Sequence, residues 1–289
     1  MKIGTRLPPF SGEIGFDAYA EWLAENGFEA VDTPRLTAEI AATCKRLGLT
    51  IGTCDCDAKG LLSADAAERR KGLDSLKRDL SAIAQYGGTT YFALLSPSDP
   101  SLGRAKNFEI WKEVYPEVVA HAEKEGVRIA VEPWPGPGPW YGNLGCTPEM
   151  WRAMFEEIPS PNLGLSFDPS HLVRIQVDYV RALHEFGDRV HHVHLKDTEI
   201  VQERLYESGI LGPSFDSPYG YGDGWWRYVI PGEGEIDWNL MIRRLEEVGY
   251  DGVLSVELED HHFTATPELQ KEGLLRAKEY VAEFLKGRE

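Results

Sequence analysis

Four side chains able to bind a divalent cation end four consecutive strand-like runs in the C-terminal half of the chain. These residues are Glu132, Asp168, His194 and Glu257. Three carboxylates and one imidazole form a mixed oxygen and nitrogen ligand set, which suits Mn, Co, Mg, Fe or Zn and leaves positions for water or substrate oxygens. Burying three carboxylates without compensation would be very costly, so we expect a cation or a proton among them.

Each of these residues also has an ordinary interpretation. A single carboxylate at a strand end is often a helix N-cap or a solvated loop residue, and a single buried histidine often has only a packing role. The shared position of all four residues favours the ligand interpretation. His192 has the parity of His194, so we expect it one layer deeper in the interior in a packing role, whereas His191 is expected to pack outward.

Further residues near these strand ends are candidate substrate contacts. His171 lies three residues after Asp168 and is a candidate substrate or metal contact, the alternative being a surface histidine. Lys196 keeps the parity of His194 and would present an ammonium to a sugar oxygen, the alternative being a solvated lysine. Tryptophans in loops often pack the loop itself, but they also form apolar walls for sugar rings. Three fit that role: Trp134, Trp140 and Trp226.

Strand-like runs alternate with helical patterns along the whole chain, which is typical of repeated βα units. We expect eight strands, near 2–6, 28–32, 49–54, 90–95, 127–132, 163–168, 190–195 and 252–257. Glycines that end helical patterns before a strand favour left-handed helix caps. These are Gly27, Gly48, Gly126 and Gly249.

The number of units favours one architecture. No Gly-x-Gly-x-x-Gly turn follows the first strand, which argues against a doubly wound nucleotide-binding sheet. Eight βα units predict an α/β fold, a single-domain (β/α)8 TIM barrel over residues 1–289, with the active site at the C-terminal strand ends. Two long loops follow such ends, at 133–146 and 198–236. The second is rich in aromatic residues, and we interpret it as a lid-like insertion.

Composition excludes several classes of function. The 289 residues contain 30 Lys+Arg against 47 Asp+Glu, a formal net charge of −17. So acidic a chain disfavours binding to nucleic acid and to anionic membranes. No apolar run is long enough for a membrane span, and the first residues lack a signal-peptide pattern. The four cysteines do not form a disulfide framework, and Cys54 and Cys56 are interpreted as packing residues, so we expect a cytoplasmic protein.

Longer motifs surround the four strand-end residues. They are Val131-Glu132-Pro133, Phe167-Asp168-Pro169-Ser170-His171, Val193-His194-Leu195-Lys196-Asp197, Pro231 to Trp238, and Gly249 to Glu257. Together they resemble the xylose-isomerase-like TIM barrel superfamily, and more narrowly its sugar phosphate isomerase/epimerase group. The resemblance covers most of the chain and is strongest over 127–260. Each motif alone is weak, whereas the combination is specific.

The resemblance implies a metal site and a pair of proton-transfer residues. In that family the residues that match Glu132, Asp168, His194 and Glu257 hold one divalent metal, commonly Mn, Co or Mg. The two glutamates also act as the acid/base pair in the family's epimerases. The histidine that matches His171 contacts substrate.

This sequence departs from two branches of the superfamily. The endonuclease IV branch uses three zinc ions and needs histidines at the second and third strand ends, yet residues 1–120 contain none. The known ketohexose 3-epimerases place a different motif after the metal-binding histidine. Their substrate therefore does not carry over to this chain.

The expected function is a metal-dependent sugar isomerase or epimerase that moves a proton through an enediolate of a ketose or keto-sugar. One divalent ion is expected, with Mn first among Mn, Co, Mg, Fe and Zn. Two alternatives stay open: a dehydratase or lyase acting on an inosose or a keto-glycoside, and a non-catalytic carbohydrate-binding barrel. A small sugar is the expected partner. The sequence does not decide between a monomer and a homo-oligomer.

Overall fold

Eight parallel strands close a barrel in the computed structural model, which describes residues 1–138, 141–215 and 219–286. Around the barrel the strands follow the order β1-β10-β7-β6-β5-β4-β3-β2. Their bounds are β1 (Lys2–Thr5), β2 (Ala30–Thr33), β3 (Thr50–Cys54), β4 (Thr90–Ala93), β5 (Arg128–Val131), β6 (Leu163–Phe167), β7 (Val190–Leu195) and β10 (Val253–Val256). The expected (β/α)8 barrel is confirmed, and each expected strand lies within two residues of its observed bounds.

The helices begin and end at residues suited to their caps. Thr37, Asp65 and Asp237 each accept a backbone N–H at a helix N-terminus. All four expected C-terminal glycines adopt positive φ, between 68° and 77°. The helices are α1 (Pro9–Ile14), α2 (Phe16–Glu25), α3 (Ala38–Leu47), α4 (Ala66–Gln85), α5 (Gly103–Glu125), α6 (Pro148–Glu157), α7 (Pro169–Arg174), α8 (Tyr179–Phe186), α9 (Gln202–Ser208), α10 (Trp238–Glu247) and α11 (Pro267–Leu285), with short 3₁₀ turns η1 (Pro100–Leu102), η2 (Gly187–Arg189) and η3 (Gly209–Leu211).

The chain forms two compact units. The first contains Met1–Val31, Asp168–Asp188 and Val193–Glu289, and the second contains Asp32–Phe167 and Arg189–His192. In the first unit, β1 pairs with β10 from Lys2↔Val253 to Thr5↔Val256, and β10 pairs with β7. The C-terminal ends of β7 and β10 therefore lie side by side.

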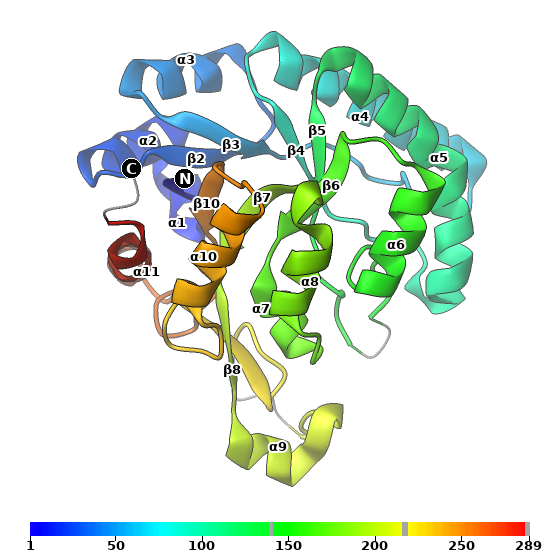
Figure 1. Ribbon diagram of the computed structural model, residues 1–289. Coiled ribbons are helices and arrows are strands. Elements are labelled where there is room, and N and C mark those ends of the chain that lie inside the picture. The colour runs from blue at the N-terminus through cyan, green and yellow to red at the C-terminus, as the bar shows by residue number, and fades with distance from the viewer. Residues whose placement is uncertain (139–140, 216–218, 287–289) are drawn as a thin grey trace. The chain divides into compact units, whose positions relative to one another are not determined.

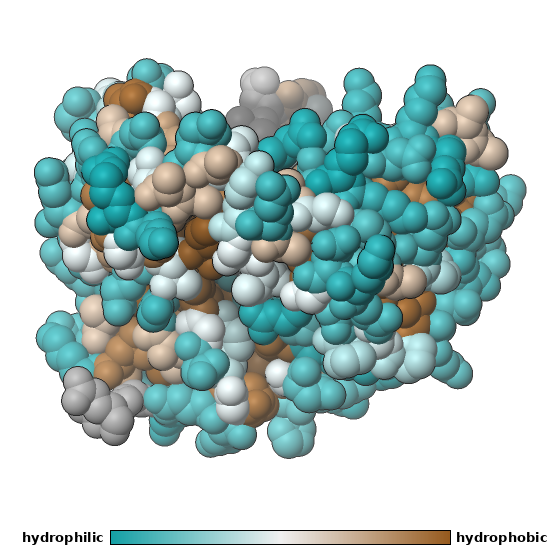
Figure 2. Space-filling model, turned by 90° about the horizontal axis from the view of Figure 1, so that it is seen from above, coloured by the Kyte–Doolittle hydropathy of each residue, from teal (hydrophilic) through white to brown (hydrophobic). Residues whose placement is uncertain are grey.

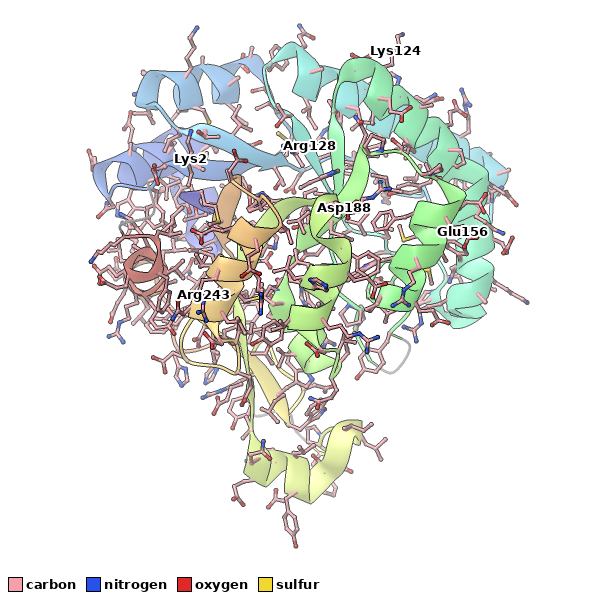
Figure 3. All side chains as sticks on the ribbon, viewed as in Figure 1. Lys2, Lys124, Arg128, Glu156, Asp188 and Arg243 are labelled. Atoms are coloured by element: carbon pink, nitrogen blue, oxygen red, sulfur yellow. The ribbon has the colours of Figure 1, made fainter. Side chains whose placement is uncertain are left out.

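The second unit contains the sheet β3-β4-β5-β6, with β4 and β5 in parallel register from Thr90↔Arg128 to Ala93↔Val131. Strand β5 begins at the exposed Arg128, which Figure 3 labels. Its guanidinium donates to Thr90 Oγ1 at 3.3 Å. The strand ends at Val131, immediately before the buried Glu132. Helix α4 buries Leu73, Leu76, Leu80 and Ile83, which three- and four-residue spacing places on one face.

The lid-like insertion of the first unit has secondary structure of its own. Strands β8 (Asp197–Ile200) and β9 (Trp226–Val229) pair antiparallel, and α9 lies between them in sequence, at the tip of the segment (Figure 1). Trp225, Trp226 and Tyr228 form a small buried cluster with Ile200 and Leu205. These three aromatic residues thus give the insertion an internal core, whereas Tyr206 and Phe215 are exposed.

Hydrophilic residues cover most of the face seen in Figure 2, in keeping with the formal net charge of −17. Within the described ranges, no helix combines the length and apolar character needed to cross a membrane.

Candidate metal centre

Three potential metal ligands meet at strand ends in the first unit. Asp168 follows β6, His194 lies in β7, and Glu257 follows β10. His194 Nδ1 is 3.4 Å from Glu257 Oε2 and 3.8 Å from Asp168 Oδ2. One ligand atom of each residue lies within 4.8 Å of those of the other two. Two carboxylate oxygens and one imidazole nitrogen at these separations suit a divalent ion.

Asp168 uses its two carboxylate oxygens differently. Oδ1 accepts the backbone N–H of Ser170 at 2.8 Å and so caps α7, whose first residue is Pro169. Oδ2 faces His194 and Lys196. The helix-cap interpretation and the ligand interpretation of a strand-end aspartate therefore describe two atoms of the same side chain.

Lys196 lies among these carboxylates and is 1% exposed, so the alternative of a solvated lysine is wrong. Its Nζ is 3.2 Å from Asp168 Oδ2 and 2.9 Å from Glu259 Oε2, and it also contacts Glu257 Oε2. Arg6 adds a second cation, with Nε 3.2 Å from Glu257 Oε1. Acidic residues at the site thus have compensating protein cations, and their burial alone does not demand a metal ion.

The same cations set the ionisation of the carboxylates. Burial would raise the pKa of Glu257, but Lys196 and His194 hold that pKa well below its usual range. Burial would also raise the pKa of Asp168, but the Lys196 ammonium opposes this, and the pKa of Asp168 is lowered. Burial would lower the pKa of Lys196, but the surrounding carboxylates raise it well above its usual value. All three groups are charged at neutral pH, as metal ligands and their counter-ion must be.

His171 is 2% exposed on α7, so the surface-histidine alternative is wrong. Its Nε2 is 3.4 Å from Asp168 Oδ2 and 3.3 Å from Lys196 Nζ. Its Nδ1 is 2.6 Å from the Tyr228 hydroxyl of β9. Through Tyr228, the lid-like insertion therefore contacts the candidate centre.

Arg174 is a residue that sequence reasoning missed. It lies one turn after His171 on α7, donates to the Tyr228 hydroxyl at 3.0 Å, and stacks its guanidinium 4.1 Å from the Trp226 ring centre. The three-residue spacing from His171 was the available signal. Trp226 is 5% exposed and packs within the lid-like insertion and against Arg174.

Two other tryptophans were expected to form walls for a sugar ring. Trp134 of the second unit is half-buried, and its carbonyl accepts a hydrogen bond from Asn143 Nδ2 at 3.2 Å. Trp140 lies outside the described residues.

Glu132 ends β5 in the second unit and is 2% exposed. Its backbone N–H donates to the Ala93 carbonyl at 3.0 Å, which continues the strand ladder up to this residue. In the same unit His192 is buried against Asp32, with Nε2 3.2 Å from Oδ2. His191 packs the other way, against Gly164. Both histidines therefore lie where strand parity places them.

Asp197 holds the lid-like insertion to the strand that carries His194. Its buried carboxylate accepts N–H bonds from Thr198, Gly232, Ile236 and the Trp238 indole, at 2.8 to 3.2 Å. Burial raises the pKa of Asp197 to about 6, although these donors oppose the shift. A Cβ on Gly234 would lie 2.3 Å from Asp197 Oδ1, so this close approach requires glycine.

A second group with metal-ligand side chains, which sequence reasoning did not single out, follows Glu257 on the same loop. It comprises Asp260, His261 and His262. Asp260 Oδ1 lies 2.9 Å from the His262 backbone N–H and 3.1 Å from His262 Nδ1, and Oδ2 accepts the N–H of Ile230 at 3.1 Å. Asp260 therefore already fastens its loop to the end of the lid-like insertion.

Comparison with known families identifies the class of this barrel. The xylose isomerase-like TIM barrel family matches residues 9–280, and the chain belongs to that family. Among curated proteins, an inosose dehydratase of Geobacillus thermodenitrificans (strain NG80-2) is 31% identical over 163 residues, which is 56% of this chain and 49% of that protein. The match thus spans about half the length of that relative.

Solved structures share the fold over nearly the full length. The D-psicose 3-epimerase from Clostridium cellulolyticum H10 has a TM-score of 0.75 at 16% identity, covering 99% of each chain. The 3-keto-D-glucoside 4-epimerase from E. coli has a TM-score of 0.70 at 20% identity, covering 98% of this chain and 99% of its own. At these identities the similarity shows the fold alone.

Proposed function

We propose that this protein is a divalent-metal-dependent isomerase or epimerase that acts on a ketose or keto-sugar. The observation that carries the proposal is the convergence of Asp168, His194 and Glu257, with ligand atoms within 4.8 Å of one another at the C-terminal ends of barrel strands. Active sites of such barrels lie at these strand ends. Epimerases with this fold are an example of proton-transfer chemistry carried out on the same barrel.

The donor set fits a divalent ion of intermediate hardness, and Mn is our first choice, ahead of Co, Mg, Fe and Zn. Asp168 Oδ2, His194 Nδ1 and Glu257 Oε2 would hold the ion. The family resemblance adds Glu132, at the end of β5, as the fourth ligand. When bound, such an ion supplies Lewis acidity that stabilises negative charge developing on a substrate carbonyl oxygen.

Glu132 and Glu257 are the proposed proton-transfer pair. One glutamate, as the carboxylate, removes the proton from the carbon next to the carbonyl, giving an enediolate. The other, as the carboxylic acid, donates its proton to the opposite face or to the neighbouring carbon. The low pKa of Glu257 keeps it ionised at neutral pH, in the form that accepts a proton. Because so acidic a group is a weak base, a closed site that excludes water would have to raise its basicity.

The other candidate residues are proposed substrate contacts. His171 and Lys196 present a ring nitrogen and an ammonium next to Asp168, where a sugar hydroxyl can bind. Trp226, in the lid-like insertion, and Trp134, in the loop after β5, would provide apolar walls for a sugar ring. A cytoplasmic location is part of the proposal, and it agrees with four cysteines that are thiols in the structure.

A second candidate reaction is dehydration of an inosose or a keto-glycoside. The 31% identity to an inosose dehydratase favours it. It needs the same first step, since a leaving group β to the carbanion diverts the intermediate to elimination. A non-catalytic carbohydrate-binding barrel is the remaining alternative, and it requires no exchangeable metal.

One experiment separates these functions. Purified protein would be stripped with a chelator, reloaded with Mn or Co, and incubated in D₂O with a panel of ketoses, inososes and keto-glycosides followed by NMR. Metal-dependent deuterium exchange with an isomeric product supports the proposal, whereas loss of water from the substrate indicates the dehydratase. Full activity of the metal-free protein would contradict the metal mechanism.

A further inference from the structure

The ammonium of Lys196 contacts the two carboxylate oxygens that the proposed metal ion would use. Nζ contacts Glu257 Oε2 and lies 3.2 Å from Asp168 Oδ2. These are also the oxygens nearest His194 Nδ1, at 3.4 and 3.8 Å. Lys196 therefore bridges two ligand atoms of the candidate centre.

The Lys196 ammonium and the proposed metal ion would compete for the same oxygens, because Asp168 and Glu257 each have only one carboxylate oxygen left for a further cation. Asp168 Oδ1 caps α7 through the Ser170 N–H, and Glu257 Oε1 pairs with Arg6. An ion bound at about 2.1 Å to the two remaining oxygens would lie close to the ammonium. Like charges at such separations in a buried site repel strongly.

The structure also offers the displaced ammonium a destination. Glu259 Oε2 is 2.9 Å from Lys196 Nζ and belongs to no ligand group of the centre. His171 Nε2, at 3.3 Å, and the Tyr228 ring, with its centre at 4.5 Å, lie next to the same ammonium. Lys196 can keep these three neighbours while it gives up Asp168 and Glu257.

We propose that Lys196 is a place-holder cation of the metal centre: it neutralises Asp168 and Glu257 in the metal-free protein and moves onto Glu259 when the ion binds. This inference rests on the proposed function, since it assumes a metal at this site. The metal-free site then stays folded without uncompensated carboxylates, and the ammonium keeps Glu259, His171 and Tyr228 as neighbours once the ion is bound.

Manganese affinity in a double-mutant cycle tests the proposal. Mn binding to the stripped protein would be measured by calorimetry for wild type, K196M, E259Q and the double variant. We expect about tenfold tighter binding by K196M, because no ammonium has to move. E259Q should weaken binding about fivefold in the wild-type background and have almost no effect in the K196M background, because Glu259 acts only by receiving Lys196. Equal effects of E259Q in both backgrounds would indicate plain electrostatics and overturn the proposal.

Thermal stability supplies a second readout. Metal-free K196M should melt at a lower temperature than wild type and gain more stability from Mn, because Asp168 and Glu257 lose their buried counter-charge. The matched control is K77M, which removes an ammonium paired with Glu117 at the surface. Its Mn affinity should equal that of wild type.

Crystal structures of wild type with and without Mn decide the question even if K196M fails to fold. Nζ should leave Asp168 Oδ2 and stay within hydrogen-bond distance of Glu259 in the Mn form. An unmoved Nζ beside a bound ion overturns the place-holder role and leaves the proposed function standing. Wild type that binds no Mn overturns both.

Discussion

At the residue scale, the candidate centre depends on how single side chains divide their atoms between folding and chemistry. Asp168 caps α7 with one oxygen and faces the centre with the other. Glu257 pairs with Arg6 through one oxygen and with Lys196 through the other. The fold thereby fixes the orientation of each carboxylate before any ligand binds, which is the pre-organisation that catalysis requires.

Replacing Glu257 by Gln should lower solvent deuterium exchange at the substrate carbon by about 10²- to 10⁴-fold, because the amide cannot accept the proton. NMR of the substrate in D₂O measures the exchange, and circular dichroism checks the fold. The matched control, Glu283→Gln, changes an exposed glutamate of α11 and should exchange like wild type. Exchange retained by the Glu257 variant would remove this residue from the proton-transfer pair.

His191 should make the stability of the protein depend on pH. Burial lowers its pKa from 6.5 to about 4, so the unfolded chain binds the proton more tightly than the folded protein. The neutral His191 side chain makes its full contribution to the free energy of unfolding above pH 6.5. This contribution, about 3 kcal/mol in total, is lost as the pH falls toward 4.

Urea unfolding between pH 4 and 7 measures this dependence. His191→Gln should show a flatter profile than wild type over that range. His184→Gln, which changes an exposed histidine of α8, should keep the wild-type slope. Equal slopes for all three proteins would refute the assignment.

At the element scale, strands and helix ends were predictable from the sequence, whereas the interior of the lid-like insertion was not. Buried apolar runs mark the eight barrel strands, and Gly48 or Gly126 marks a helix end by its positive φ. The β8–β9 pairing has no such signal, because the aromatic residues of this segment follow neither the two-residue period of a strand nor the 3.6-residue period of a helix. Lys196 was predicted near the site, but its contacts with Asp168 and Glu259 depend on side-chain directions that the sequence does not contain.

Asp197 accepts hydrogen bonds from both ends of the insertion, at Thr198, Gly232 and Ile236. We call this set of bonds the Asp197 clamp. Replacing Asp197 by Asn should destabilise the protein by about 2 to 3 kcal/mol, since the amide nitrogen would face N–H donors and leave them unsatisfied. Urea unfolding measures the loss. Asp251→Asn, at an exposed position, is the control and should change stability by less than about 0.5 kcal/mol. A similar effect of both substitutions would show that the clamp contributes little.

At the scale of the whole molecule, the net charge of −17 sets the background against which a cation binds. The barrel family was predictable because the strand-end motifs occur in the right order over most of the chain. The substrate was not, since residues that select a sugar lie in loops whose conformation no local pattern fixes.

Metal removal should lower the melting temperature of the whole protein. Mn at about 100 times its dissociation constant would add about 2.7 kcal/mol of stability, because the ion binds the folded state alone. That free energy corresponds to a rise of several degrees in a chain of this size. Differential scanning calorimetry with chelator and then with Mn measures it, and identical melting temperatures would argue against a resident ion.

Anomalous diffraction from a Mn-soaked crystal would show whether the strand-end residues hold a metal ion. We expect a strong anomalous peak about 2.0 to 2.4 Å from Asp168 Oδ2, His194 Nδ1 and Glu257 Oε2. A peak at Asp260, His261 and His262 alone, or none near the three strand-end residues, would contradict it.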